Sequence, residues 1–395
     1  MKTKRNVLIA LGWHDPRILE GVGRYAKEAG WHLEMRAVIE SALPAYWRGD
    51  GMLANDTEVP RIKRFIENQI RLQPTVLIGS NHRYAGFPSV QEDNGEVGRL
   101  AAVHFLERGH QNFAWLGLPH GRSEMGRREA FVKTLQASGR SCHVLEWMGE
   151  TSQRRDTWDN RREWLGVQLK SITKPLAVFV LDDVVAMDVI DVCLDFGLRV
   201  PEDVAVMGVG NMELACECAR VPISSIDENL SEIAYRAAAL LAEVMEGTCA
   251  GTDPGALREP LLVPVRGVFM RRSTDSLAVT HPGVQKALAF MTARVQETIG
   301  IGDIARAAGL SERALQYAFK NELRRTPVRQ LLLLRLERAA HLLVSGESKV
   351  ATVAEACGFG SVRHLHRCFV QKHGCSPQAY RNGEAGREST AGRGA

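Results

Sequence analysis

Short apolar runs alternate with amphipathic stretches over residues 5–275. The run NVLIALGW is followed by PRILEGVGRYAKEAG, whose apolar residues recur at helical spacing, and then by WHLEMRAV. Further apolar runs stand beside amphipathic stretches later in the chain: TVLIGS, NFAWLGLP, LAVFVLDD and DVAVMGVG. Strands that alternate with helices predict parallel, doubly wound α/β sheets, which bind ligands at the carboxyl ends of their strands. A stretch of this length suits two such lobes with a cleft between them.

The pattern changes near residue 300, where one helical layout occurs twice. Residues 301–319 (IGDIARAAGLSERALQYAF) align with residues 350–369 (VATVAEACGFGSVRHLHRCF), and each copy reads as helix, glycine turn, helix. Gly309 and Gly358 supply the backbone freedom that each tight turn requires. This layout is that of a helix-turn-helix unit, whose second helix enters a DNA major groove. The alternative is an amphipathic helical hairpin that is repeated for packing alone.

The flanking residues support two matched units. Ser311 and Ser361 are placed to cap the second helices, and Pro327 and Pro377 close the units at the same offset. Between the copies, residues 328–346 have the length and apolar content of one linking helix. Such a helix would hold the two units so that they meet successive major grooves roughly 34 Å apart.

Helical geometry predicts which side chains of these units face DNA. When the buried side is anchored on Leu315 with Phe319, and on Leu365 with Phe369, basic and amide side chains turn outward. Arg and Gln suit guanine and adenine edges, and basic residues near the helix ends suit phosphates, where Arg324 and Arg325 would also lie. The predicted DNA-binding residues are Ser311, Arg313, Gln316, Tyr317, Lys320, Ser361, Arg363, His364, Arg367 and Lys372. His364 is expected to point outward and His366 is not, so this pair predicts no metal site.

The charge distribution agrees with a polyanion partner for the C-terminal part alone. Residues 281–395 contain seventeen Lys or Arg and nine Asp or Glu, which gives a net charge of +8. Because the whole chain of 395 residues carries +4, the preceding part carries −4. A basic module joined to a mildly acidic larger one indicates nucleic-acid binding by the former, although a solvated basic surface would give the same totals.

Motif content argues against catalysis and against a metal or cofactor. The chain has no P-loop, no H-E-x-x-H and no G-x-S-x-G motif, so we expect no enzyme activity. Its eight cysteines are scattered, which predicts reduced thiols, and Cys216 with Cys218 forms a lone C-x-C without a second pair. No window reaches the ~18 consecutive apolar residues of a membrane span. We therefore expect no membrane partner and a cytoplasmic location.

The C-terminal repeat resembles the DNA-binding domain of the AraC/XylS family over about a hundred residues. That family's second half reads R-x-x-A-x-x-L-L, then I-A-x-x-x-G-F, then F-x-x-x-x-G-x-S-P-x-x-Y-R. The matching residues here are Arg335 or Arg338 with Ala339, Leu342 and Leu343, then Val353, Ala354, Gly358 and Phe359, and finally Phe369, Gly374, Cys375, Ser376, Pro377, Tyr380 and Arg381. Leu365 replaces the usual aromatic residue, which should change packing rather than function.

The larger part resembles the effector domain of LacI/GalR regulators, a relative of periplasmic sugar-binding proteins. The stretch PSVQEDNGEVGRLAAVHFLERGHQNFAWLGLP (88–119) is close to that family's V-x-x-D-N-x-x-G pattern and its continuation, and residues 182–211 and 221–241 continue the likeness. The resemblance implies a two-lobed α/β effector domain that binds a small sugar and pairs side by side into a homodimer.

The same resemblance implies the effector-binding residues, because carboxylates and Arg suit sugar hydroxyls. Carried over onto this chain, they are Trp13, Asp15, Asp93, Arg127, Asp182 and Asn211. Alternatives remain open: Trp13 as a core residue, and Asp93 or Asp183 as a helix cap. Gly210 stands where the family commonly has an Asp that touches the sugar, so a changed specificity is expected. Asn211 would take over part of that role.

An effector domain of this kind joined to AraC-type helices is similar to the arrangement in xylose operon regulators. The resemblance implies a transcription activator with a double-stranded DNA operator, a sugar effector of the D-xylose type and RNA polymerase as partners. The rival interpretations are an effector-independent architectural DNA-binding protein whose lobes serve only for dimerisation, and a regulator of a non-pentose ligand. The expected units are residues 1–276 (effector binding and dimerisation), 277–283 (linker), 284–382 (DNA binding, with helix-turn-helix motifs at 301–321 and 350–371) and 383–395 (disordered tail).

Overall fold

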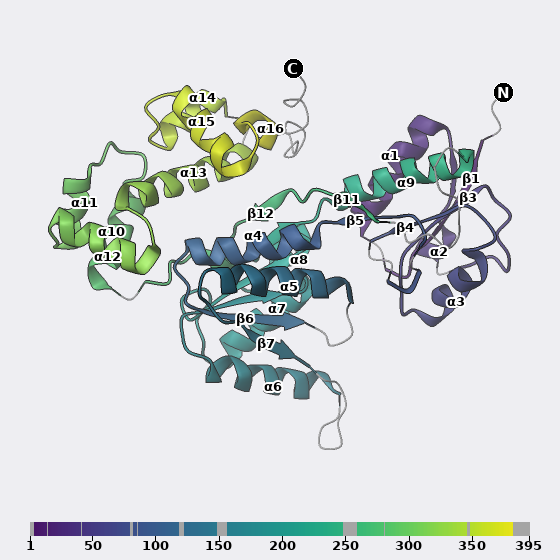
Figure 1. The fold of residues 1–395 in the computed structure, drawn as a ribbon, viewed down its shortest axis with the longest axis horizontal. Coiled ribbons are helices and arrows are strands. Elements are labelled where there is room, and N and C mark those ends of the chain that lie inside the picture. Colours follow the sequence, from purple (N-terminus) through teal and green to yellow (C-terminus); the bar gives the residue numbers. More distant parts are fainter. Residues whose placement is uncertain are drawn as a thin grey trace.

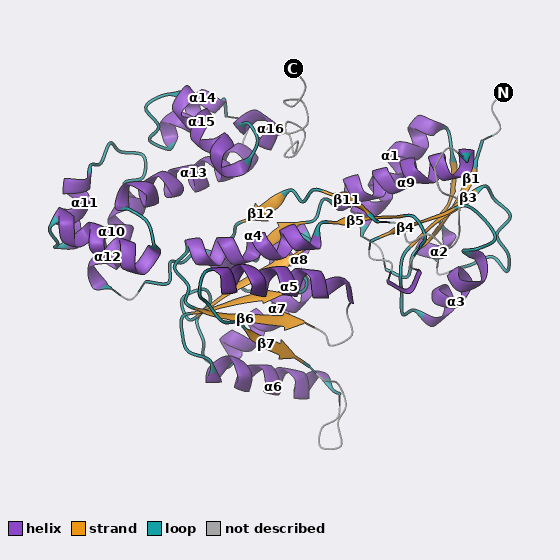
Figure 2. Ribbon diagram, in the orientation of Figure 1, coloured by secondary structure: helices purple, strands orange, loops and turns teal. Residues whose placement is uncertain are grey.

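Two six-stranded sheets and a helical domain make up the computed structural model of this chain (Figure 1). The structure describes residues 4–13, 15–40, 42–79, 82–84, 86–117, 122–147, 156–247, 259–279, 281–345 and 348–381. The expected tail at 383–395 lies outside these ranges. The fold class predicted from the alternating pattern, a two-lobed α/β domain followed by an all-α domain, is confirmed (Figure 2).

Lobe 1 contains the N-terminal sheet, whose six strands are all parallel. In spatial order the strands are β11 (Leu261–Val263), β5 (Ser89–Glu92), β4 (Thr75–Ile78), β3 (Gly51–Ala54), β1 (Asn6–Ala10) and β2 (His32–Glu34). The helices of this lobe are α1 (Pro16–Ala29), α2 (Arg36–Ile39), α3 (Pro60–Gln69) and α9 (Leu230–Glu246). Helices α1 and α9 bury one face of the sheet in a Val-, Ile- and Leu-rich core, and α3 covers the other face.

Lobe 2 repeats this architecture with one antiparallel edge strand, β12. Its strands, in spatial order, are β12 (Gly267–Phe269), β10 (Ser224–Asp227), β9 (Val204–Val209), β8 (Leu176–Val180), β6 (Asn112–Gly117) and β7 (His143–Glu146). Its helices are α4 (Asn94–Glu107), α5 (Arg122–Ala137), α6 (Trp158–Ser171), α7 (Asp183–Asp195) and α8 (Glu213–Cys218). An aromatic-rich core lies under α4 and α5, and an aliphatic core lies under α6 and α7 on the opposite face.

The chain crosses between the lobes three times. It leaves lobe 1 after β5, returns after β10, and crosses again after β11 to form β12. The first crossing begins at Glu92, the last residue of β5, and the second begins at Glu228, directly after β10. Both acidic residues are buried. Because the two lobes are joined by these crossings, a movement of one lobe against the other would bend the chain there.

The helical domain contains two small cores joined by one long helix. Its elements are α10 (Pro282–Ala293), α11 (Ile301–Ala308), α12 (Glu312–Leu323), α13 (Pro327–Ser345), α14 (Val350–Ala356), α15 (Val362–His373) and α16 (Pro377–Arg381). Helix α13 contributes Leu331 to the first core, and Leu336 with Leu343 to the second. The predicted pair of helix-turn-helix units and the single linking helix are therefore confirmed. Helix α10 begins at Pro282, inside the expected linker.

Lobe 2 and the helical domain contact each other through the end of α4. The carbonyl oxygen of Arg108 accepts a hydrogen bond from the Ala278 amide at 2.8 Å, and its guanidinium donates to Glu337 of α13 at 3.1 Å. Glu107 pairs with Lys372 of α15 at 2.9 Å. Among the described helices, none combines the length and apolar character that a membrane crossing requires.

Candidate effector site and nucleic-acid interface

Charged side chains from both lobes gather at the carboxyl ends of the strands. Asp15 follows β1, Asp182 follows β8 and Gly210 follows β9, while Glu92 ends β5 and Glu228 follows β10. These ends belong to two separate sheets, yet hydrogen bonds connect them through two arginines. The predicted ligand-binding edge of the two sheets is thus a single polar cluster.

Arg17 is the arginine that connects the lobes directly. Asp15 caps α1 by accepting a hydrogen bond from the Arg17 amide at 2.9 Å, and its two oxygens also accept from the Arg17 guanidinium at 2.8 Å each. The remaining guanidinium nitrogen donates to the carbonyl oxygens of Gly210 at 2.6 Å and Asn211 at 3.3 Å. Asp15 therefore orients Arg17, and its hydrogen bond raises the pKa of that guanidinium. Arg17 was not predicted as a site residue. The one signal in the sequence was its position two residues after the cap, Asp15.

Arg127 is held by protein groups on all sides rather than presented to solvent. Its Nε donates to Asn94 Oδ1 at 2.5 Å, and one Nη donates to the Leu181 carbonyl at 2.9 Å. The other Nη pairs with Glu92 at 3.0 Å and with Glu228. Arg127 is only 8% exposed. Because it pairs with both Glu92 and Glu228, it links the first two lobe crossings. As a sugar ligand it would have to exchange one of these partners.

Glu228 is the acidic partner with the most perturbed proton affinity. Burial raises its pKa to about 7, although the charge of Arg127 opposes the shift. Glu92 and Glu228 were not predicted as site residues. The available signal was an acidic residue placed directly at the end of a buried strand, where a charge is costly unless it is paired.

Two further predicted carboxylates cap helices, as Asp15 does at the start of α1. Asp93 accepts from the Glu96 amide at 2.9 Å at the start of α4, and Asp182 accepts from the Val185 amide at 2.8 Å at the start of α7. The expectation that Asp183 caps this helix was wrong. Its carboxylate turns inward, 2% exposed, and its burial raises its pKa to about 6.

Asp183 instead organises the loop that holds Gly210. It accepts hydrogen bonds from Ser225 Oγ at 2.5 Å and from the Met212 amide at 2.7 Å. Gly210 has φ +115°, and a Cβ there would lie 3.4 Å from an Asp183 oxygen and 4.0 Å from a Glu228 oxygen. A side chain at 210 would be strained and would face two carboxylates. Asn211, with φ 49°, accepts from Arg271 at 3.0 Å.

Trp13 lies on the surface two residues before Asp15. Its side chain is 53% exposed, so the alternative of a core tryptophan was wrong. Its carbonyl oxygen accepts a hydrogen bond from Asn55 Nδ2 at 3.0 Å. An exposed indole beside polar groups offers an apolar face on which a sugar ring can stack.

The second helices of the repeat begin with the predicted caps. Ser311 Oγ accepts from the Ala314 amide at 3.2 Å, and Ser361 Oγ accepts from the His364 amide at 3.1 Å, so both cap predictions are confirmed. The turns before them contain Gly309 at φ +67° and Gly358 at φ +71°. The caps stabilise the start of each second helix, and the glycines permit the left-handed turn before it.

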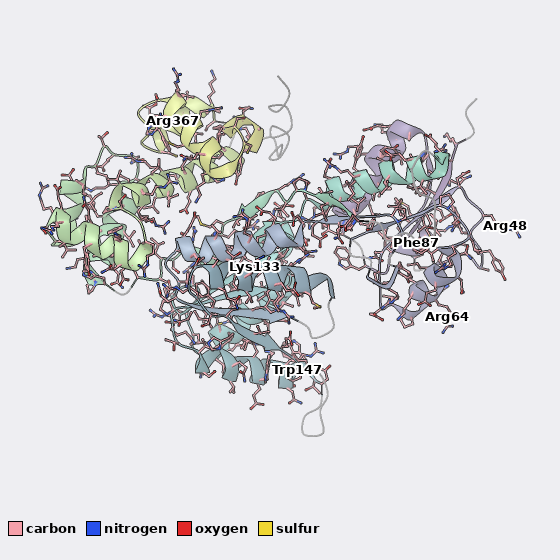
Figure 3. All side chains as sticks on the ribbon, viewed as in Figure 1. Arg48, Arg64, Phe87, Lys133, Trp147 and Arg367 are labelled. Atoms are coloured by element: carbon pink, nitrogen blue, oxygen red, sulfur yellow. The ribbon has the colours of Figure 1, made fainter. Side chains whose placement is uncertain are left out.

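The outward faces of α12 and α15 carry most of the predicted DNA-binding side chains. The exposed members are Ser311, Arg313, Gln316, Tyr317, Lys320, Ser361, Arg363 and Arg367, and Figure 3 labels Arg367 on the second unit. The anchors on the inner faces, Leu315 with Phe319 and Leu365 with Phe369, are fully buried. The surface is basic and rich in donors, as a major-groove contact requires.

Three predictions at this surface need correction. His364 is half-buried, with its ring 5.5 Å from that of Phe359, whereas His366 is exposed, which reverses the predicted orientations. Lys372 is 18% exposed and pairs with Glu107 of lobe 2, so it faces the effector domain rather than a phosphate. Arg325, expected at a phosphate, is also half-buried at this contact.

The described residues of the two sites form no group of donors that could hold a metal ion. Within the described ranges, no group of three His, Cys, Asp or Glu side chains is placed to hold one. Cys216 is buried and Cys218 is exposed, so the two thiols do not face a common point. Burial raises the pKa of the Cys216 thiol, which disfavours the thiolate that a metal would need.

Comparison with known proteins identifies both parts. Residues 102–274 match the family model of the periplasmic binding protein-like domain, and residues 304–383 match that of a helix-turn-helix domain. The chain is 26% identical to the xylose operon regulatory protein of Haemophilus influenzae, over 93% of this chain and 95% of that protein. It is 27% identical to the protein of the same name from Escherichia coli K12, over 93% and 94%.

A solved structure has the same two-part fold. The structure of a xylose-binding transcription activator superposes with a TM-score of 0.58 and 24% identity, over 96% of this chain and 98% of that one. The similarity therefore extends over both lobes and the helical domain in the same order. The chain is a homologue of the xylose operon regulatory proteins, and it is a DNA-binding transcription regulator that joins a periplasmic binding protein-like domain to an AraC-type helix-turn-helix domain.

Proposed function

We propose that this regulator senses a small sugar of the pentose type, with D-xylose as the first candidate, and activates transcription in response. The observation that carries the proposal is the polar cluster in which Arg17 and Arg127 connect strand ends of both lobes. The names of the two full-length relatives support a sugar of this class. A regulator that binds chromosomal DNA acts in the cytoplasm.

The sugar would bind between the lobes, where carboxylates accept its hydroxyl protons and arginines donate to its oxygens. The candidate ligands are Trp13, Asp15, Asp93, Arg127, Asp182 and Asn211, to which the geometry adds Arg17. Trp13 would stack on the apolar face of the ring. Since the cluster draws on both lobes, a bound sugar favours the arrangement in which the lobes are close together.

Closure would then reposition the helical domain, because lobe 2 contacts it through Arg108 and Glu107. In a homodimer, this movement brings two pairs of recognition helices onto operator half-sites. The regulator bound to the operator would then recruit RNA polymerase. By linkage, operator DNA should in turn tighten sugar binding. The proposed units are 1–276 for the effector and the dimer, 277–283 for the linker and 284–382 for DNA.

Thermal denaturation with a sugar panel tests the proposal. The panel contains D-xylose, L-arabinose, ribose and glucose at millimolar concentration. We expect a selective rise in the unfolding midpoint with one pentose, because only a ligand that prefers the folded state stabilises it. Equal midpoints with every sugar would reject the pentose sensor and leave DNA binding to be tested separately by fluorescence anisotropy.

A further inference from the structure

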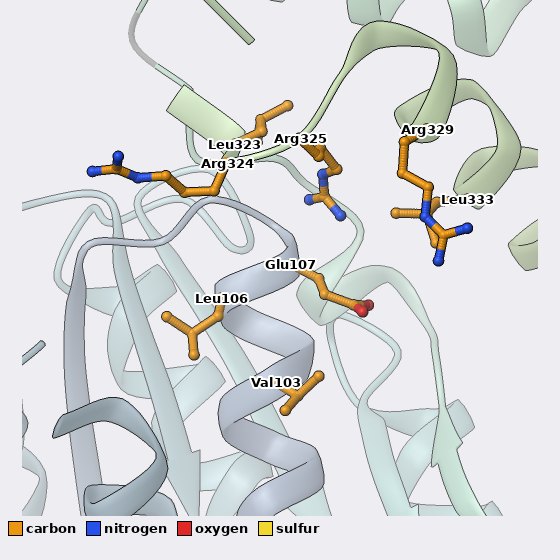
Figure 4. A pocket seen from close by; sticks show the side chains of 8 residues that line it. All are labelled: Val103, Leu106, Glu107, Leu323, Arg324, Arg325, Arg329 and Leu333. Carbon is orange, nitrogen blue, oxygen red and sulfur yellow. The ribbon is translucent and has the colours of Figure 1, made fainter. Parts of the chain in front are cut away.

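A cavity of about 320 Å³ lies where lobe 2 meets the helical domain. One wall is the end of α4, with Leu106 and Glu107, and the other is the turn between α12 and α13 together with the first turns of α13 (Figure 4). Its volume is at the small end of the range for ligand pockets, which suits a small metabolite or an ion. The cavity is separate from the polar cluster between the lobes.

Among the described residues that line this cavity, three are arginines and one, Glu107, is acidic and already paired. The turn between α12 and α13 contributes Arg324 and Arg325, and α13 contributes Arg329. Glu107 forms an ion pair with Lys372 at 2.9 Å. Figure 4 shows the Arg325 guanidinium pointing from the turn toward α4 and Glu107, while Arg324 points to the opposite side. The lining therefore has an excess of positive charge.

Arg325 has donors that the described part of the protein does not use. Its Nε and one Nη are buried without a hydrogen-bond partner among those residues. Burial removes water from this guanidinium and lowers its pKa. The negative charges of Glu107 and Glu337 act to raise the pKa, but their effect is smaller. A buried, charged donor without an acceptor is unfavourable, and an acceptor that enters the cavity from solution would lower this cost.

The turn that carries Arg325 is fixed. Arg324 ends α12 in the left-handed region, at φ 56°, with its amide bonded to the Lys320 carbonyl at 3.1 Å. Thr326 Oγ accepts from the Arg329 amide at 3.2 Å, which caps α13. The two guanidiniums of Arg325 and Arg329 are thus presented from a defined backbone, with apolar contacts from Leu106 and Leu333 on the walls.

We infer that this interdomain cavity binds a small oxyanion of the phosphate class, held by Arg325 and Arg329. Guanidinium groups match the oxygens of phosphate in bidentate geometry, and a dianion would neutralise the excess charge of the lining. Because the lining comes from both domains, the bound anion stabilises their docking and adds a second input to the sugar signal. The source is either free phosphate or the phosphate group of a small phosphomonoester.

Isothermal titration of the full-length protein tests the inference. Sodium phosphate and glycerol 3-phosphate are titrated separately at an ionic strength held constant with sodium chloride. We expect saturable binding of at least one of them, and Arg325→Gln should weaken it by on the order of tenfold or more, since it removes charged hydrogen bonds. Tighter binding of the ester identifies a metabolite as the source, and tighter binding of inorganic phosphate identifies the free ion.

Two further variants separate loss of the site from loss of the fold. Arg329→Gln changes an exposed residue and should weaken phosphate binding, whereas Glu107→Gln removes the negative charge and should tighten it several-fold, a gain that misfolding cannot produce. Arg306→Gln, an exposed arginine of α11 outside the cavity, is the matched control. Absence of saturable binding, or equal phosphate affinity in wild type and Arg325→Gln, would overturn the inference.

Discussion

Arg17 of lobe 1 donates a hydrogen bond to the carbonyl oxygen of Gly210 in lobe 2, 2.6 Å away. Asp15 accepts hydrogen bonds from the other two guanidinium nitrogens and so orients the third nitrogen toward the Gly210 carbonyl. Asp15 and Arg17 together therefore connect lobe 1 to lobe 2. The loop at 210 has φ +115°, a conformation that favours glycine, so the residue that offers this carbonyl has no side chain of its own.

Arg17→Ala should weaken sugar binding by on the order of tenfold, because a charge-assisted hydrogen bond across the lobes contributes about 1.5–3 kcal/mol. Calorimetric titration with the sugar that stabilises wild type would measure it. Arg24→Ala is the control, since Arg24 lies on the same helix but pairs with Glu232 inside lobe 1. Equal losses in both variants would remove Arg17 from the signal path.

Glu228 should make the protein less stable as the pH rises. Its pKa is about 7 in the folded chain against an ordinary value of 4.5, so the folded state binds this proton more tightly than the unfolded state. Its contribution to the free energy of unfolding is fully present below about pH 4.5 and is lost as the pH approaches and passes 7. Urea unfolding between pH 4.5 and 8 should show a shallower decline for Glu228→Gln than for wild type. An unchanged pH slope would mean that another group titrates.

Arg363→Ala and Arg367→Ala should each reduce operator affinity by on the order of tenfold and relax base preference, as loss of a base contact costs about 1–3 kcal/mol. Both side chains are exposed on α15. The measurement is fluorescence anisotropy with duplexes that the wild-type protein selects from a random library. Lys286→Ala, exposed on α10 outside the repeat, should bind as wild type does.

Glu337→Gln should uncouple the two binding events. Glu337 accepts from Arg108, which is 5% exposed and also donates to the Thr274 carbonyl at 3.0 Å, so the pair connects lobe 2 to α13. DNA affinity without sugar should remain near the wild-type value, whereas the sugar-induced change in DNA affinity should shrink several-fold. The control is Glu355→Gln, an exposed change on α14. Full coupling in the Glu337 variant would place signal transfer elsewhere.

Gly358→Ala should be more destabilising than Gly309→Ala, although both turns have the same backbone conformation. Both glycines have positive φ, which costs an alanine about 1 kcal/mol. At 358 the added Cβ would also lie 2.7 Å from the Val295 carbonyl oxygen, whereas at 309 no atom of the described residues lies within 4 Å of it. Chemical unfolding of the two variants gives the comparison directly. Equal losses would show that the backbone conformation alone decides the cost.

Sequence periodicity predicted the elements whose physics is local. The helix-turn-helix units follow from the spacing of Leu315 and Phe319, the caps Ser311 and Ser361, and the turn glycines, because each interaction lies within a few residues of chain. The apolar runs that contain β1, β6, β8 and β9 likewise predicted these strands. The strands β3, β11 and β12 were not identified, although the equally short β2 and β4 were, because three or four residues carry little periodic signal and a strand of that length is found only where a clear apolar run surrounds it.

What only the tertiary structure decided is the pairing of charges that lie far apart in the chain. The sequence alone indicated a sugar-type polar site and a basic DNA surface, but it could not show that Arg127 binds Glu92 and Glu228, or that Lys372 turns to Glu107. A periodic pattern specifies which side of a helix is polar. Which partner a charge meets depends on how the two sheets and the helical domain are placed together, and that placement results from packing between distant segments.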